Sequence, residues 1–213
     1  MVTNEIKTDS SLVAHLLRRA GFGSDYSQIQ EFTKKKYEEI VEDFLHPENF
    51  PEVEDKLISR HYPSLGANKD NQAVWNGRWF YRMINTKRPL QEKMALFWHH
   101  VLATGWTKSE HTPTMVNHIE MLRKNGLKNF RTILIELSKD PAMIYWLDNN
   151  ENHSKSINEN YGREILELFS MGIGNYTEDD IKNAARSFTG WTFTQPLPLY
   201  PYGHYESKFI FKK

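Results

Sequence analysis

Two histidines, His99 and His118, are the side chains in this sequence best suited to chemistry. An imidazole can exchange a proton near neutral pH, and a neutral imidazole is a common metal ligand. His100 cannot join His99 at one metal, because neighbouring residues on a helix point about 100° apart. The chain has no Glu-x-x-His or His-Glu-x-x-His spacing, so a metal site would have to combine His99, His118 and Glu164 from separate helices. Histidines hydrogen-bonded within a helical core are the simpler interpretation.

Arg163 and Glu164 are the second group of candidates, in a segment that also carries Asn160 and Glu167. Arg163 and Glu167 are four residues apart and can pair along a helix. Because apolar residues surround these charges, one interpretation is a partly buried polar clamp that joins helices. The other is a polar cleft in which Glu164 acts as a base or ligand and Arg163 holds an anionic group.

A catalytic site would combine His99, His118, Arg163 and Glu164 in one cleft between the middle helices, with or without a metal. No complete catalytic motif supports such a site. The serines lack a Gly-x-Ser-x-Gly setting, and the glycines after Arg19 end a helix, whereas phosphate loops open one. The sequence identifies no cofactor. We therefore favour a non-catalytic or partner-dependent helical module, and we keep an enzyme with a His/Glu/Arg site between helices as the alternative.

The composition excludes several classes of protein. The chain has 213 residues, with 27 Lys and Arg balanced by 27 Asp and Glu, and no cysteine. A balanced charge argues against a protein that coats nucleic acid, which needs an excess of positive charge. The lack of cysteine excludes disulfides, thiolate zinc sites and cysteine nucleophiles. No apolar run approaches the roughly 20 residues that span a bilayer, so we expect a soluble chain. No secretory signal is visible, and the sequence does not identify the cellular compartment.

Helical periodicity dominates the chain and predicts a single, mainly α domain over residues 1–213. Apolar residues recur every three to four positions in the segments that we expect to be helical. These segments are Ser10–Ala20, Ser24–Phe32, Tyr37–Leu45, Val74–Ile84, Leu90–Thr104, Thr112–Asn125, Asn129–Ser138, Asp140–Leu147, Ile157–Met171 and Thr177–Gly190. We expect serines to cap the first two, and a short helix and a loop within Phe50–Lys69. The Leu90–Thr104 segment is apolar on nearly every side, which predicts a buried central helix.

The last part of the chain changes to the periodicity of strands. Trp191 and Phe193 alternate with threonines, and Phe209 and Phe211 alternate beyond a proline-rich turn. This pattern predicts a short β-hairpin within residues 191–213. Because the hairpin has no other predicted strand to join, we expect the chain to be the N-terminal part of a longer domain.

Three blocks of the sequence together resemble one protein family. They are AHLLRRAGFG at residues 14–23, RPLQEKMALFWHHVLATG at residues 88–105 and ENYGREILELFSMGIGNYTEDDIKNAARSFTGWTF at residues 159–193. Their order and spacing are similar to those of a bacterial family of uncharacterised proteins, domain of unknown function 1800 (DUF1800). The third block is the most specific of the three.

This resemblance implies little about activity, because the biochemical role of the family is not established. It implies a domain considerably longer than this chain. Many members of the family carry export signals, and this chain differs from them in showing none. A protein partner, or the rest of the longer domain, would then complete any site around the middle helices.

Overall fold

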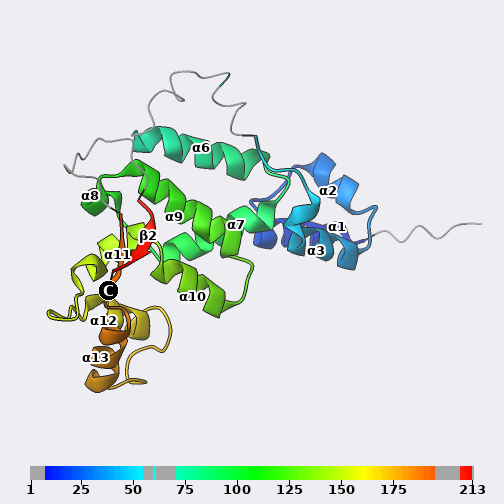
Figure 1. The fold of residues 1–213 in the computed structure, drawn as a ribbon. Helices are drawn as coiled ribbons and strands as arrows, with labels where there is room; N and C mark the ends of the chain where they lie inside the picture. Colours follow the sequence, from blue (N-terminus) through cyan, green and yellow to red (C-terminus); the bar gives the residue numbers. More distant parts are fainter. Residues whose placement is uncertain (1–7, 55–59, 61–70, 195–206, 213) are drawn as a thin grey trace, which may run out of the picture. The chain divides into compact units, whose positions relative to one another are not determined.

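The computed structural model of the chain is mainly helical (Figure 1). It describes residues 8–54, 60, 71–194 and 207–212. The chain divides into two compact units, Met1–Asn68 with Ala73–Phe97, and Lys69–Gln72 with Trp98–Lys213. The single domain expected over the whole chain stays a prediction. None of the described helices is long and apolar enough to cross a bilayer.

The first unit consists of short helices around a small apolar core. Its helices are α1 (Ser10–Ala20), α2 (Tyr26–Phe32), α3 (Tyr37–Leu45), the 3-10 helix η1 (Pro47–Asn49), α6 (Gln72–Asn85) and the larger part of α7 (Pro89–Val101). The core side chains are Val13, Leu17, Ala20, Ile40 and Phe44. The predicted helix and loop of Phe50–Lys69 fall mostly outside the described residues.

Aspartates begin the first two helices, where we expected serines. The Asp9 carboxylate accepts a hydrogen bond from the backbone N–H of Ser11 at 2.7 Å, and the Asp25 carboxylate accepts one from that of Gln28 at 2.8 Å. Aspartate caps a helix as well as serine does, and its charge also favours the positive end of the helix dipole. The expected serine caps were therefore wrong, although both helices form where the periodicity predicts them.

The second unit contains the larger core. Its elements are α8 (Trp106–Ser109), α9 (Thr112–Asn125), α10 (Phe130–Ser138), α11 (Pro141–Trp146), η2 (Asn149–Glu151), α12 (Asn160–Glu167), α13 (Glu178–Ser187), β1 (Trp191–Phe193) and β2 (Phe209–Phe211). The core side chains are Leu102, Leu122, Ile133, Leu137, Met143, Leu147, Tyr161 and Ile165. Five of these eight residues lie on α9, α10 and α12, so these helices place most of the side chains that surround the candidate site.

The β-hairpin at the end of the second unit is confirmed. Strands β1 and β2 are antiparallel, with Trp191 opposite Phe211 and Phe193 opposite Phe209. The Trp191 and Phe209 rings pack with their centroids 5.1 Å apart, which adds a cross-strand aromatic pair to the backbone hydrogen bonds. The proline-rich turn between the strands lies outside the described residues.

Helix α7 differs from the buried central helix that its composition predicts. Of its residues only Glu92 and Ala95 are buried, whereas Leu96 and Phe97 are exposed. The boundary between the two compact units falls within this helix, after Phe97. Apolar residues on every side of a helix thus do not require that one core encloses it. Trp98, just beyond the boundary, packs against the core of the second unit.

Two buried asparagines hold the start of the hairpin and α13 in place. Asn149 donates through Nδ2 to the carbonyl of Trp191 at 2.9 Å, and Asn152 donates to the carbonyl of Ala185 at 2.8 Å. Helix α12 packs closely on α13 because Gly162 has no side chain. A Cβ atom at Gly162 would lie 2.7 Å from the backbone nitrogen of Ala185. These contacts fix α12 and the α13–β1 turn in the second unit.

Candidate functional site

The structure brings the two candidate histidines together inside the second unit. The rings of His99 and His118 have centroids 5.6 Å apart and are inclined at 61°. His118 has no exposed surface, and its Nδ1 is hydrogen-bonded to the Asp140 carboxylate. The other carboxylate oxygen of Asp140 accepts from the backbone N–H of Ala142 at 3.1 Å and caps α11. One aspartate therefore serves both the helix start and the buried imidazole.

Burial determines the protonation state of His99. Removal from water, together with a smaller effect of charge repulsion from the nearby His118, lowers the pKa of His99 to about 4. His99 is therefore neutral at pH 7. The Nε2 atom of His118 is also buried and has no hydrogen-bond partner within the described part of the chain. A carboxylate–histidine pair with an open Nε2 can orient a base or hold a metal ion.

The metal interpretation lacks a third ligand. Among residues 8–54, 60, 71–194 and 207–212, no group of three or more His, Asp or Glu side chains is placed to hold a metal ion. Structural and catalytic zinc sites use at least three protein ligands. Two neighbouring histidines and one aspartate that already bonds His118 do not make such a set. The metal site of His99, His118 and Glu164 thus stays a prediction.

A tyrosine and a serine extend the buried polar centre. Tyr161 on α12 donates through its hydroxyl to Oγ of Ser138 at 2.7 Å, and Ser138 donates to the carbonyl of Leu134 at 2.7 Å. Burial raises the pKa of Tyr161, its hydrogen bond with Ser138 lowers it in part, and the charge of Asp140 raises it. Tyr161 is therefore neutral at pH 7 and acts as a hydrogen-bond donor.

Arg163 lies apart from this centre. It is two residues from Tyr161, about 200° around α12, so the two side chains leave opposite faces of the helix. Its guanidinium bonds both carboxylate oxygens of Glu178 on α13 at 3.1 Å and lies 3.6 Å from Glu159. This is the geometry of the helix clamp, with Glu178 and not Glu167 as the main partner.

Glu164 is affected by burial and by its neighbours on α12. Burial raises its pKa, the neighbouring Glu167 raises it further, and Arg163 lowers it. The structure thus joins His99 with His118 and joins Arg163 with α13, and a catalytic site that combines the four residues in one cleft stays a prediction.

Sequence reasoning missed Asp140, Tyr161 and Ser138. Asp140 was recognised only as the start of a helix before a proline. Its second role depends on His118, 22 residues earlier in the chain, and no local pattern predicts that pairing. A buried tyrosine in an apolar helix face could have signalled a polar partner, because buried hydroxyl groups are almost always hydrogen-bonded.

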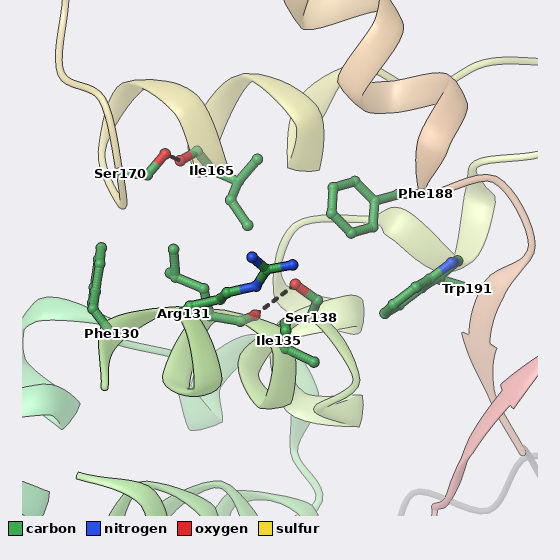
Figure 2. A pocket seen from close by; sticks show the side chains of 9 residues that line it. Phe130, Arg131, Ile135, Ser138, Ile165, Ser170, Phe188 and Trp191 are labelled. Atoms are coloured by element: carbon green, nitrogen blue, oxygen red, sulfur yellow. Dashed lines mark hydrogen bonds between the residues drawn. The ribbon is translucent and has the colours of Figure 1, made fainter. Parts of the chain in front are cut away.

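A groove on the surface of the second unit, which shares Ser138 with the buried polar centre, is a feature that the sequence did not predict (Figure 2). It has a volume of about 600 Å³, within the range of ligand-binding clefts. Its walls come from α10, from the end of α12 with the following turn, and from the turn between α13 and β1. The lining residues are Phe130, Arg131, Leu134, Ile135, Ser138, Ile165, Ser170, Phe188 and Trp191.

Arg131 is the single charged residue among those lining the groove. Figure 2 shows its guanidinium within the groove, between Phe130 on one side and Phe188 and Trp191 on the other. Arg131 forms no ion pair with any residue in the described part of the chain. The Arg131 side chain is exposed beside apolar walls, and a cation that has no carboxylate of its own protein can pair with an anionic group from outside.

A second hollow, in the first unit, has a different character. It has a volume of about 560 Å³ and lies beside α1, α2, α3 and the end of α6. Among its lining residues, Lys35 is already paired with Asp43, Nζ to Oδ2 at 2.6 Å. The charges of that ion pair are satisfied within the protein. The other charged residues that line this hollow, Glu31 and Lys87, carry opposite charges, whereas a single charged residue lines the groove of the second unit, so we take the groove as the candidate site.

Comparison with known proteins places the chain in one family. Searches of curated proteins and of solved structures gave no match. A protein-family model matches residues 15–213, which is nearly the whole chain. The description of that family is "protein of unknown function (DUF1800)", so membership assigns no activity, and it confirms the resemblance found in the three sequence blocks. The chain belongs to the DUF1800 family.

Proposed function

We propose that this chain is a non-catalytic binding module and that it binds a protein partner through the groove of the second unit. The observation that carries the proposal is the open apolar groove with Arg131 inside it. Exposed apolar side chains that line a concave surface are typical of sites where another molecule binds. Phe130 and Ile135, on the wall formed by α10, are exposed by 42% and 41%.

The residues that could do chemistry support the same proposal. His118 is fully buried and bonded to Asp140, so a substrate has no access to its ring in this conformation. The guanidinium of Arg163 is already paired with the carboxylate of Glu178, so an anionic substrate would have to displace Glu178 to bind it. An enzyme would need these groups around one accessible cleft. The geometry therefore supports binding better than it supports catalysis.

An apolar, anionic dye tests whether the groove binds. The probe is 8-anilinonaphthalene-1-sulfonate, whose aromatic rings suit the walls and whose sulfonate suits Arg131. We expect saturable binding at one site per chain, with energy transfer from Trp191, which lines the groove. The change Ile135→Asp places a charge on the wall and should weaken dye binding at least tenfold, because desolvating that charge is costly.

Ile157→Asp is the matched control, because Ile157 is 39% exposed and does not line the groove. Circular dichroism and thermal unfolding should show that both variants remain folded. Equal dye binding by both variants, or no binding by the unmodified chain, would contradict the proposed function.

A further inference from the structure

We infer that the partner presents an apolar segment with a carboxylate at its centre, and that this carboxylate pairs with Arg131. The inference rests on the proposed function and deepens it, because it states the chemistry of the partner. It follows from three properties of Arg131: its place in the helix, its lack of an ion pair within the described chain, and its position in the groove.

Helix stability does not explain an arginine at this position. Arg131 is the second residue of α10, and that helix has no acidic residue in its first turn. The amino end of a helix carries a partial positive charge, so a cation there is unfavourable and a carboxylate is favoured. Asn129 already caps the helix by accepting the backbone N–H of Thr132 at 2.9 Å. Arg131 is thus placed against the local electrostatic preference.

The groove itself also leaves the charge of Arg131 unbalanced. Its other lining residues are aliphatic, aromatic or serine, with no acidic side chain. The hydroxyl groups of Ser138 and Ser170 already donate to backbone carbonyls, of Leu134 at 2.7 Å and of Ile165 respectively (Figure 2). Arg131 is exposed in the unbound chain, so a carboxylate from a partner can reach the guanidinium and form a two-pronged pair, and apolar residues of the partner would then exclude water from that pair.

The position of the Arg131 guanidinium in the groove favours a peptide helix over a fatty acid as the partner. In Figure 2 it lies between an aromatic side chain at one end, Phe130, and two at the other, Phe188 and Trp191. If the carboxylate of a fatty acid paired with Arg131, near the middle of the groove, its single tail would fill only the half of the groove on one side of Arg131. A peptide helix with an acidic residue between two apolar residues would fill both halves. Spacings of four residues put each apolar side chain about 6 Å along the helix axis from the acid.

Synthetic peptides test the inference directly. Each is a blocked, alanine-rich helix of about 15 residues, a length at which such helices begin to form in water. Leucines stand four residues before and after a central residue, which is Glu, Gln or Lys. Isothermal titration calorimetry against the whole chain should give about tenfold tighter binding for Glu than for Gln, and weaker binding still for Lys.

Variants of Arg131 complete the test. Arg131→Gln should remove the preference for Glu over Gln, and Arg131→Glu should reverse it, so that the Lys peptide binds best. Arg186→Gln is the control, because Arg186 is an exposed arginine of α13 outside the groove and should leave the preference unchanged.

The remaining outcomes separate this inference from the proposed function. Equal binding of the three peptides, or binding of none of them, would overturn the inference while the dye result still supports a binding groove. If dodecanoate displaces the dye and no peptide does so, the groove binds anionic amphiphiles and the inference is wrong. If the dye itself fails to bind at the groove, the proposed function fails first.

Discussion

The buried histidine centre and the open groove lie in the same unit, and they differ in how their charged groups are satisfied. In the centre, His118 and Asp140 bond each other, and Asp140 also caps α11. In the groove, Arg131 has apolar neighbours and no carboxylate partner among the described residues. In one region, residue types that could do chemistry are thus hydrogen-bonded to each other and to a helix start. In the other, a residue that stability does not explain marks the surface where function is expected.

The largest expected effect comes from removing Asp140. Asp140→Ala leaves the Nδ1 of a fully buried histidine without its partner and removes the cap of α11. We expect the free energy of unfolding to fall by about 3 kcal/mol or more, measured by urea unfolding. Asp140→Asn should cost less, because asparagine keeps the cap and can accept a hydrogen bond. Asp43→Ala, which breaks the surface pair with Lys35, is the control and should cost much less.

The difference in stability between Asp140→Ala and Asp43→Ala tests whether the histidine centre supports the fold. If Asp140→Ala unfolds no more easily than Asp43→Ala, the histidine centre does not support the fold and has to be reconsidered as a functional site. Dye binding by the folded fraction should be unchanged in both variants, since neither residue lines the groove.

Acid should weaken the fold through His99. Its pKa falls from 6.5 in the unfolded chain to about 4 in the folded protein. As the pH drops from 6.5 to about 4, the unfolded chain therefore binds a proton that the folded chain does not, and stability is lost. The full shift corresponds to about 3 kcal/mol, which partial solvent exposure reduces to about 1–2 kcal/mol.

Urea unfolding of His99→Gln between pH 4 and pH 7 measures this contribution. The variant should lose less stability on acidification than the unmodified protein, and the exposed His100→Gln should behave like the unmodified protein. Identical pH profiles for all three chains would show that His99 is protonated in the folded state and is more accessible than the structure indicates.

Arg163→Gln should have a small effect on both regions. It removes a surface pair with Glu178, and exposed ion pairs contribute little to stability. We expect a slightly lower thermal midpoint, no change in dye binding and no change in peptide preference. A large loss of dye or peptide binding would instead place Arg163 in the functional site, as the cleft interpretation requires.

The smallest change in stability should come from Arg131→Gln. It removes a cation from the first turn of α10, so the thermal midpoint should stay the same or rise slightly. The same variant should lose the preference for the Glu peptide. A loss of stability larger than that of Arg163→Gln would show that Arg131 serves the fold, and the contrast between the two regions would then disappear.

Local patterns predicted much of the fold. The segment expected to be helical from Thr177 is one example, because Thr177 caps α13: its Oγ accepts from the backbone N–H of Asp180 at 3.2 Å, and the Asp180 carboxylate accepts from that of Thr177 at 2.9 Å. The hairpin is another, because alternating aromatic residues on both sides of a turn have few other structures to adopt. The clamp interpretation of Arg163 also fits the structure, although its main partner, Glu178, lies 15 residues away.

The sequence by itself determined where helices and strands form and to which family the chain belongs, since periodicity, caps and motifs involve residues close together in the chain. Only the tertiary structure decided that His118 meets Asp140, that Arg163 faces α13, and that Arg131 lies in a groove. The physical reason is distance along the chain. These contacts join residues on different helices, and packing of the helices selects them.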